Sequence, residues 1–220
     1  MKTIKWTIKI TSILLLVSVM LFSCKKKKTA PTLTLNGTET SSLCLGDPYE
    51  ELGASAIDAY GDNVDVVITG DVDIATVGNY IITYTATDKN DNVTSVETTV
   101  AVEMCASSLL GNYTIVSDCQ VMGFDIVSAD QEILPGLTAN EFIIDNFNFA
   151  ISQITASVEG STITVPLNSF DYDTGIIGVI TITISGVGTV NETGTEMIIV
   201  YTYDAGIAGS GTCTATYTKV

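Results

Sequence analysis

The stretch GNYIITYTATDKNDNVTSVETTVAV, residues 78–102, carries the clearest fold signal of the chain. Apolar or small side chains occupy alternate positions before its loop, at Tyr80, Ile82, Tyr84 and Ala86. A similar alternation follows the loop, at Val96, Thr98, Val100 and Val102. Successive side chains of a strand point to opposite faces, so each segment is a predicted strand with one buried face. The Asp and Asn residues at 88–92 favour a turn, and the stretch is therefore a predicted β-hairpin.

The rest of the chain from Thr32 onward has the same character. Runs rich in Val, Ile, Thr and Tyr recur along it, and Gly, Asn and Asp interrupt them at short intervals. The best helical candidate is Thr138 to Asp145, where Thr138 would cap the first turn and Glu141 would take its third position. The apolar run at 142–144 suits a strand equally well. The predicted fold class is all-β.

A series of short motifs occurs between residues 47 and 103. In chain order it comprises Tyr49, Gly53-Ala54-x-Ala56-x-Asp58, Val77-Gly78-x-Tyr80, Tyr84-Thr85-Ala86-Thr87-Asp88 and an Asn-containing turn before the last strand. This series resembles the Ig-like domain of bacterial surface proteins that also occurs in pesticidal crystal proteins. The resemblance implies a small β-sandwich, which we place at residues 32–105, and a spacer or binding module rather than a catalyst.

Residues 106–220 read as a meander of about eight strands that ends with Glu196 to Tyr203 and Thr212 to Tyr217. Gly111-Asn112-Tyr113 resembles the Gly-x-Trp opening of lipocalin-like barrels, with Tyr in place of Trp. We therefore expect a lipocalin-like or half-barrel β domain, and a second sandwich is the alternative. An Ig-like module followed by such a domain resembles uncharacterised Bacteroidetes lipoproteins associated with polysaccharide-use loci.

The N-terminus has the features of an export signal. Lysines at positions 2, 5 and 9 precede the apolar run Ile10 to Phe22, whose 13 residues are too few to span a bilayer. Leu21-Phe22-Ser23-Cys24 resembles the lipobox of bacterial lipoproteins. The resemblance implies a signal peptide at residues 1–23, lipid attachment at Cys24 and a tether at 24–31, with an ordinary cleaved signal or a short buried helix as the alternatives.

The expected location is the cell envelope, as an outer-membrane lipoprotein held to the membrane by its N-terminal lipid. In the Bacteroidetes-type lipoproteins that the leader resembles, acidic residues after the cysteine favour export to the cell surface. This chain has lysines at 25–28 instead, which suit a tether attracted to anionic headgroups. The periplasmic and the surface-facing orientation therefore both stay open.

Composition excludes several kinds of chemistry. From Thr29 to Val220, Lys89 and Lys219 oppose 25 carboxylates, a net charge of −23, which disfavours binding to nucleic acid. The chain has no His and no Arg. It therefore lacks a Ser-His-Asp or Cys-His arrangement, an imidazole metal site and a bidentate phosphate clamp. We expect a protein that is not an enzyme.

Four cysteines follow Cys24, at positions 44, 105, 119 and 213. An even number in an exported chain indicates disulfides, and the sequence alone permits three pairings. The positions favour Cys44–Cys105 and Cys119–Cys213, because each bond would then tie the first strand of a domain to its last. The chain has no Cys-x-x-Cys spacing, so metal binding by these residues is not expected.

Two acidic motifs have a chemical and a structural interpretation. Asp88, Asn90 and Asn92 fit the letters of a calcium-binding linker, but a hairpin turn is favoured and Lys89 would oppose a cation. No cofactor is therefore expected, with Ca²⁺ as the alternative. Asp171 and Asp173 could form the carboxylate pair of a glycoside hydrolase, but the following Thr-Gly favours a turn.

Three tyrosines are the candidate ligand-binding residues. Tyr201 and Tyr203 point to the same side of a strand, and Tyr172 is expected on a nearby loop. Exposed tyrosines can stack on sugars, whereas buried ones would be core residues with satisfied hydroxyls. The predicted function is glycan or oligosaccharide binding by the C-terminal domain, with the Ig-like domain as a spacer. The alternatives are an accessory module of an outer-membrane protein complex and a lipocalin-like carrier of an apolar ligand, which needs a hollow barrel.

Overall fold

The computed structural model describes residues 29–121, 123–147, 152–173, 175 and 178–220. The predicted signal peptide, Cys24 and the first residues of the predicted tether lie outside this range. The elements within it are strands and two short 3-10 helices, so the prediction of an all-β fold is confirmed. None of the helices in the described residues is long and apolar enough to cross a membrane.

The chain divides into two compact units. One comprises the residues up to Asn36, Gly53–Ile68 and Tyr84–Val96, and the other comprises Gly37–Leu52, Thr69–Thr83 and Glu97–Val220. The proposed domain limits at 32–105 and 106–220 stay predictions.

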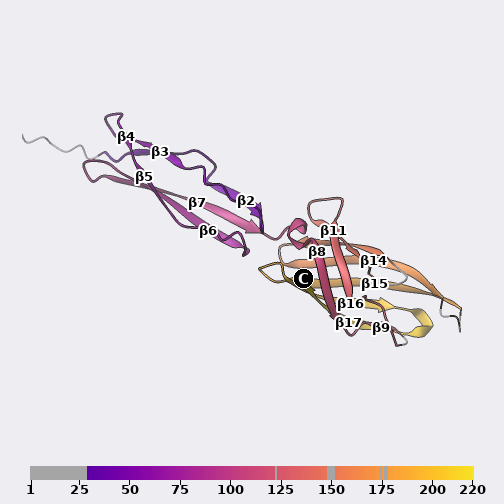
Figure 1. Ribbon diagram of the computed structural model, residues 1–220. Coiled ribbons are helices and arrows are strands. Elements are labelled where there is room, and N and C mark those ends of the chain that lie inside the picture. Colours follow the sequence, from indigo (N-terminus) through magenta and orange to yellow (C-terminus); the bar gives the residue numbers. More distant parts are fainter. Residues whose placement is uncertain (1–28, 122, 148–151, 174, 176–177) are drawn as a thin grey trace, which may run out of the picture. The chain divides into compact units, whose positions relative to one another are not determined.

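The N-terminal region contains two small sheets (Figure 1). The first has the order β1-β3-β4, with strands Thr32–Leu35, Ala54–Ile57 and Asn63–Val64. The second has the order β2-β7-β6-β5, with strands Thr40–Cys44, Val93–Glu103, Gly78–Thr87 and Val66–Thr69. Strands β6 and β7 are the predicted hairpin. Its predicted face is buried at Ile82, Tyr84, Ala86, Thr98, Val100 and Val102.

The C-terminal region forms a closed eight-stranded barrel, in which every pair of neighbouring strands is antiparallel. Its order is β11-β12-β13-β14-β15-β16-β17-β8. The strands are β8 (Gly111–Ser117), β11 (Asp130–Pro135), β12 (Glu141–Asp145), β13 (Gln153–Glu159), β14 (Thr162–Asp173), β15 (Val179–Val190), β16 (Glu196–Asp204) and β17 (Ser210–Lys219). The short helices are η2 (Ala106–Leu109), before β8, and η3 (Gly206–Ala208), between β16 and β17. Closure removes the unpaired edges that a second sandwich would have kept.

The helical candidate at 138–145 is a turn followed by β12. Phe142 and Ile144 alternate with half-buried residues and point into the barrel, where both are fully buried. This period of two gives Phe142 and Ile144 a common buried face, whereas a helix would have turned them apart.

Aromatic side chains fill the barrel interior that the described residues line. Tyr113, Tyr201, Tyr217 and Phe142 are all buried there. The hydroxyls of Tyr201 and Tyr217 lie 2.7 Å apart and share a hydrogen bond, and the Tyr113 hydroxyl donates to the carbonyl of Leu109. A packed interior of this kind does not suit the hollow barrel that a lipocalin-like carrier requires.

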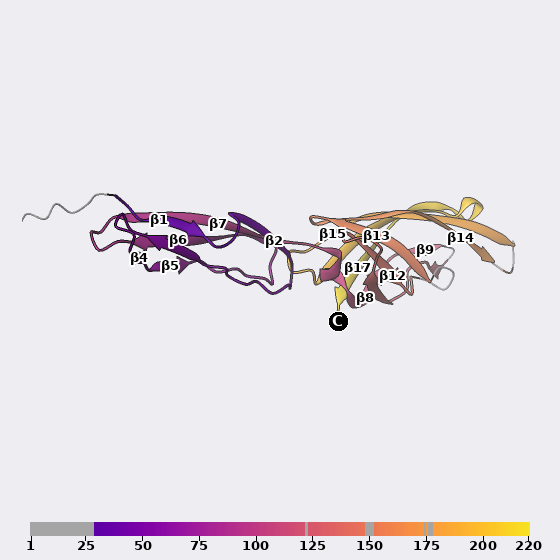
Figure 2. The same ribbon diagram turned by 90° about the horizontal axis from the view of Figure 1, so that it is seen from above.

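The described residues between β8 and β11, 118–121 and 123–129, form a covering segment over the barrel. The segment contains the two-residue strands β9 (Gln120–Val121) and β10 (Phe124–Asp125), which pair with each other. Strand β9 lies beside the barrel strands in both ribbon views (Figures 1 and 2). The segment buries Cys119, Val121, Ile126 and Val127 in the same core as the barrel.

Both disulfides have the pairing that the cysteine positions favoured. Cys44, the last residue of β2, is bonded to Cys105 after β7. Cys119 of the covering segment is bonded to Cys213 of β17. The second bond therefore fastens the covering segment to the wall of the barrel.

Candidate ligand-binding site

Tyr201 is a core residue and is removed from the candidate ligand residues. Its side chain is completely buried, its hydroxyl is hydrogen-bonded to that of Tyr217, and its ring packs edge-on against Phe147 with centroids 5.6 Å apart. Burial raises the pKa of Tyr201 well above its usual range. The alternative interpretation of this residue, a core tyrosine with a satisfied hydroxyl, is the correct one.

Tyr203 points to the same side of β16 as Tyr201 and is half-buried against the barrel core. A Cβ atom at Gly211, its partner on β17, would come within 3.1 Å of the Tyr203 hydroxyl. Tyr203 therefore leans over a glycine of the neighbouring strand and contributes mainly to packing.

Tyr172 lies in β14 rather than on a loop, because β15 pairs with β14 as far as Asp173. Its half-buried ring makes an edge contact with Phe124 of β10, with centroids 6.2 Å apart and planes at 61°. Phe124 is 55% exposed. The structure thus brings one predicted residue, Tyr172, next to an aromatic residue that the sequence analysis missed.

The sequence signal for the exposure of Phe124 is the glycine before it, a residue type that favours turns. The residue follows Gly123, which has a φ of 82°, and its strand is two residues long. A hairpin this short cannot bury both of its faces, so a large apolar residue on it is expected to be exposed. Only the tertiary structure shows that this residue meets Tyr172, which is 48 positions away in the sequence.

The covering segment holds Phe124 through several bonds. Asp118 exchanges two hydrogen bonds with Thr214 of β17, since its N–H donates to the Thr214 carbonyl and its carboxylate accepts from the Thr214 N–H. Within the segment, the Ile126 N–H donates to the Cys119 carbonyl, and the Gln120 amide donates to the Asp125 carboxylate. With the Cys119–Cys213 bond, these contacts fix the position of an otherwise short hairpin.

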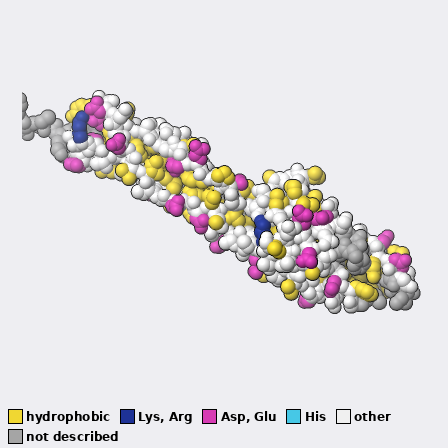
Figure 3. Space-filling view, in the orientation of Figure 1, with side chains coloured by type: hydrophobic (Ala, Val, Ile, Leu, Met, Phe, Trp, Pro, Cys, Tyr) yellow, Lys and Arg dark blue, Asp and Glu magenta, His cyan; other side chains and the backbone are white. Residues whose placement is uncertain are grey.

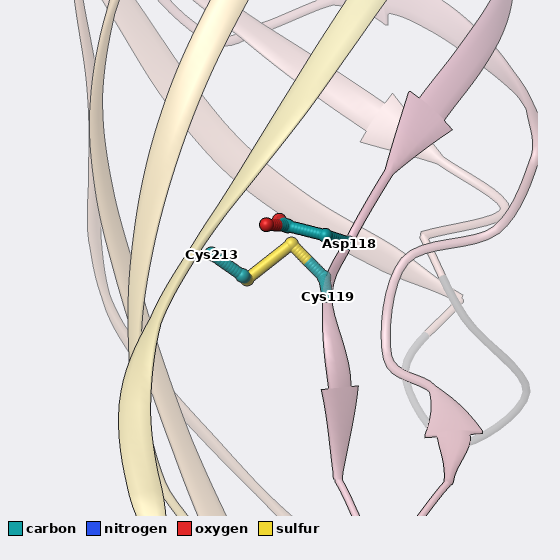
Figure 4. A group of neighbouring side chains, drawn as sticks. All are labelled: Asp118, Cys119 and Cys213. Carbon is teal, nitrogen blue, oxygen red and sulfur yellow. A yellow bond between two sulfur atoms is a disulfide. The ribbon is translucent and has the colours of Figure 1, made fainter.

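Asp118, Cys119 and Cys213 lie together and combine residue types that can ligate metals (Figure 4). The two sulfur atoms are bonded to each other, so neither is a thiolate that could bind a metal ion. The Asp118 carboxylate accepts the Thr214 N–H. The group therefore anchors the covering segment to β17.

The Asp88 carboxylate is used by its own loop. One of its oxygens accepts the N–H groups of Asn90 and Asn92, and the other accepts the Asn92 side-chain amide. The Asn92 side chain, with the backbone N–H groups and Lys89, lowers the pKa of Asp88 against the effect of burial. These bonds are those of a turn, and the Lys89 ammonium in the same loop opposes a calcium ion.

Asp58 has the same arrangement in the loop between β3 and β4. Its carboxylate accepts the N–H groups of Tyr60 and Asp62, and Lys89 lies 3.5 Å from it and 3.1 Å from the Asp62 carboxylate. Burial opposes ionisation of Asp58, but these hydrogen bonds and Lys89 lower its pKa overall. Two motif residues of the Ig-like series, Asp58 and Asp88, are thus the acceptors that shape two loops.

Asp171 and Asp173 are exposed on the face of β14 opposite to Tyr172. The Asp171 carboxylate accepts the Thr181 hydroxyl at 2.7 Å, and the Asp173 carboxylate accepts the Gly175 N–H. Both carboxylates are therefore on a solvated strand surface, which does not provide the enclosed pair that glycoside hydrolysis uses. Figure 3 shows that carboxylates outnumber lysines on the face of the molecule in view, in line with the composition.

Comparison with known proteins gives a family for part of the chain. Among solved structures, the lipoprotein BT2262 from Bacteroides thetaiotaomicron matches with 22% identity and a TM-score of 0.33, covering 86% of this chain and 100% of that one. The CBM51-2 and INT domains of Clostridium perfringens ZmpB, in complex with GlcNAc, match with 12% identity and a TM-score of 0.29, covering 86% of this chain and 44% of that one. No curated protein matches. Residues 33–102 match the family described as bacterial surface protein, Ig-like domain, which is the family that the motifs in this stretch resemble.

Proposed function

We propose that this chain is a non-catalytic, lipid-anchored protein of the cell envelope that binds a glycan through Phe124 and Tyr172. The observation that carries the proposal is a 55% exposed phenylalanine ring, in edge contact with a tyrosine, on a hairpin that a disulfide fastens to the barrel. The Ig-like domain would serve as a spacer between the lipid and the barrel.

An exposed phenylalanine forgoes part of the roughly 1.5–3 kcal/mol that full burial of a large apolar side chain contributes. A ligand that covers the ring recovers this energy. The C–H groups on one face of a sugar ring pack against the negative face of an aromatic ring, and an adjacent tyrosine adds an apolar surface with a hydroxyl. A rigid hairpin lowers the entropy that such an aromatic contact costs on binding.

The test is a binding screen of soluble protein comprising residues 29–220 against diverse polysaccharides, followed by titration of the best ligand. Phe124→Ala and Tyr172→Ala are each expected to weaken binding about tenfold or more, because truncation of a central aromatic residue in a binding site commonly costs 1–2 kcal/mol. Leu137→Ala is the matched control, since Leu137 is also an exposed apolar residue but lies in the β11–β12 turn.

Equal binding by the Phe124→Ala variant and the unaltered protein would disprove a site at Phe124. Repeating the titration with millimolar Ca²⁺ tests the alternative role of the Asp88 loop. Binding that requires Ca²⁺ and survives both aromatic substitutions would move the site away from the barrel.

A further inference from the structure

One outer face of the barrel differs from the rest of this acidic chain. It consists of the outward-facing residues in 162–167 of β14, 185–189 of β15, 198–202 of β16 and 212–216 of β17. Among these described residues every outward-facing side chain is Thr, Ser, Val, Ile, Leu or Pro, and none is charged. We call this surface the uncharged face.

The strand register makes the uncharged face continuous. Val187 of β15 pairs with Thr164 on one side and with Val200 of β16 on the other, and Val200 pairs with Thr214 of β17. Val187 is 61% exposed and Val200 is 46% exposed. Two directly paired valines at the centre of a four-strand surface thus face solvent, where their apolar area is unburied.

The same face carries a protruding side chain next to a groove. Leu167 is 72% exposed because the pairing of β14 with β15 is interrupted between Val165 and Asn168, and this irregularity turns Leu167 outward. Leu167 itself forms part of the rim of a groove of about 350 Å³. Pro166, Val187 and Val200 contribute the other exposed apolar walls. A protruding side chain and a groove on one surface make that surface self-complementary, which is the property of a two-fold contact between identical chains.

The charge distribution favours a second copy of the chain at this face over the face formed by β8, β11 and β12. The carboxylates of Asp130, Glu132 and Asp145 line a hollow of about 290 Å³ on the outside of β8, β11 and β12. Glu132 and Asp145 are directly opposite each other across two strands. Two copies that met through that side would bring like charges together at the centre of the contact, whereas the uncharged face has its carboxylates only at the rim.

We propose that two copies of this chain associate through the uncharged face, with Leu167 of each copy in the groove of the other. The face has thirteen outward-facing residues, fewer than the 20–30 residues per partner of a standard stable interface, so the dimer is weak. Glu196 and Asp204, at the two ends of β16, lie at the rim and repel their counterparts. Salt screens this repulsion, and the association therefore strengthens as ionic strength rises.

Sedimentation velocity of soluble residues 29–220, over protein concentrations of about 1–500 µM at low and high salt, tests the proposal. The expected result is a concentration-dependent shift from monomer to dimer that is larger at high salt. Val187→Asp places a carboxylate at the centre of the face and is expected to weaken dimerisation at least tenfold, and Leu167→Ala weakens it by removing the protruding side chain. Val179→Asp is the matched control, because Val179 is 64% exposed on the same strand but lies outside the face.

Circular dichroism melting of both Asp variants checks that they are folded. Phe124→Ala is expected to dimerise like the unaltered protein, which separates this proposal from glycan binding. A monomer at every concentration and salt, or equal dimerisation by the folded Val187→Asp and Val179→Asp variants, would overturn the proposal.

Discussion

Single residues determine what fills the barrel. Gly186 and Gly188 occupy inward-facing positions of β15, where the other inward residues are branched and apolar. A Cβ atom at Gly186 would come within 2.9 Å of the Tyr201 ring, and one at Gly188 would come within 2.4 Å of the Ile198 carbonyl oxygen. The missing side chains therefore provide the space that Tyr201 and Ile199 occupy. Because Gly186 leaves room for the Tyr201 ring, Tyr201 is a core residue rather than a ligand-binding one.

Gly188→Ala is expected to lower the free energy of unfolding by about 1–3 kcal/mol, because the new methyl group meets backbone atoms that cannot move aside. Gly78→Ala is the matched control. At that position a Cβ atom would make only ordinary contacts with the Tyr80 ring, and φ is not in the left-handed region, so stability should be kept or slightly raised. Thermal or urea unfolding of the two variants checks the difference, and equal effects would contradict it.

The buried Asp58 and Asp88 carboxylates make the Ig-like region sensitive to acid. Their pKa values are lower in the folded than in the unfolded chain, so their contribution to stability is fully present above about pH 4. It is lost as the pH falls through the lowered folded values. Unfolding measured from pH 7 to pH 2 should therefore show a loss of stability below pH 4, and Asp88→Asn should reduce this slope. An unchanged slope in that variant would show that Asp88 titrates normally.

At the scale of elements, the covering segment depends on tertiary contacts for its position. Strands β9 and β10 have two residues each, too few to be stable as an isolated hairpin. The Cys119–Cys213 bond, the paired hydrogen bonds of Asp118 with Thr214 and the burial of Val121 and Val127 hold the segment in place. The position of Phe124 next to Tyr172 therefore depends on these attachments.

Replacing both Cys119 and Cys213 with Ala is expected to cost about 2–5 kcal/mol of stability, since the bond closes a long loop of the unfolded chain. If the proposed function is correct, glycan affinity should fall as well, because Phe124 loses its anchored position. Denaturant unfolding and ligand titration at a temperature where the variant is folded measure the two effects. The Cys44→Ala/Cys105→Ala variant is the matched control, and it should lower stability without lowering glycan affinity. An equal loss of glycan affinity in both double variants would contradict a local role for the Cys119–Cys213 bond.

At the scale of the whole molecule, the negative net charge restricts which ligands and protein partners can bind. A net charge of −23 from Thr29 to Val220 repels anionic polymers. In the barrel, outward-facing acidic residues line the hollow on β8, β11 and β12, while the uncharged face lies on β14 to β17. The proposed ligand is thus a neutral glycan, and the proposed contact between copies is on the side without charge.

A polysaccharide that contains uronic acids is expected to bind more weakly than a neutral one of the same linkage. This deficit should shrink as salt rises from about 20 to 300 mM, because the Debye length falls over this range. Affinity electrophoresis or calorimetry at the two ionic strengths checks the trend. Tighter binding of the acidic polymer by residues 29–220 at low salt would contradict it, since it would require a cluster of basic residues, and the lysines of this part of the chain are Lys89 and Lys219.

The sequence by itself determined the all-β class and the hairpin at 78–102, and its motifs resembled the Ig-like family that residues 33–102 match. It also indicated about eight strands in residues 106–220, where the described residues form ten, eight of them in the barrel. The strands and the hairpin depend on local alternation and on turn residues, which act over a few positions of the chain. The cysteine positions also favoured the correct disulfide pairing among three, since each bond joins the ends of a segment. The sequence analysis included Tyr172 among the candidate ligand-binding residues but placed it on a loop, whereas it lies in β14.

Only the tertiary structure decided the closure of the barrel, the burial of Tyr201, the contact of Phe124 with Tyr172 and the uncharged face. Alternation shows that a strand has two faces, but it does not show which strands become neighbours. Tyr201 and Val200 are adjacent in sequence, yet one fills the barrel because Gly186 leaves room for it and the other faces solvent. Such assignments depend on pairings between distant strands, and these are fixed by the packing of the complete barrel.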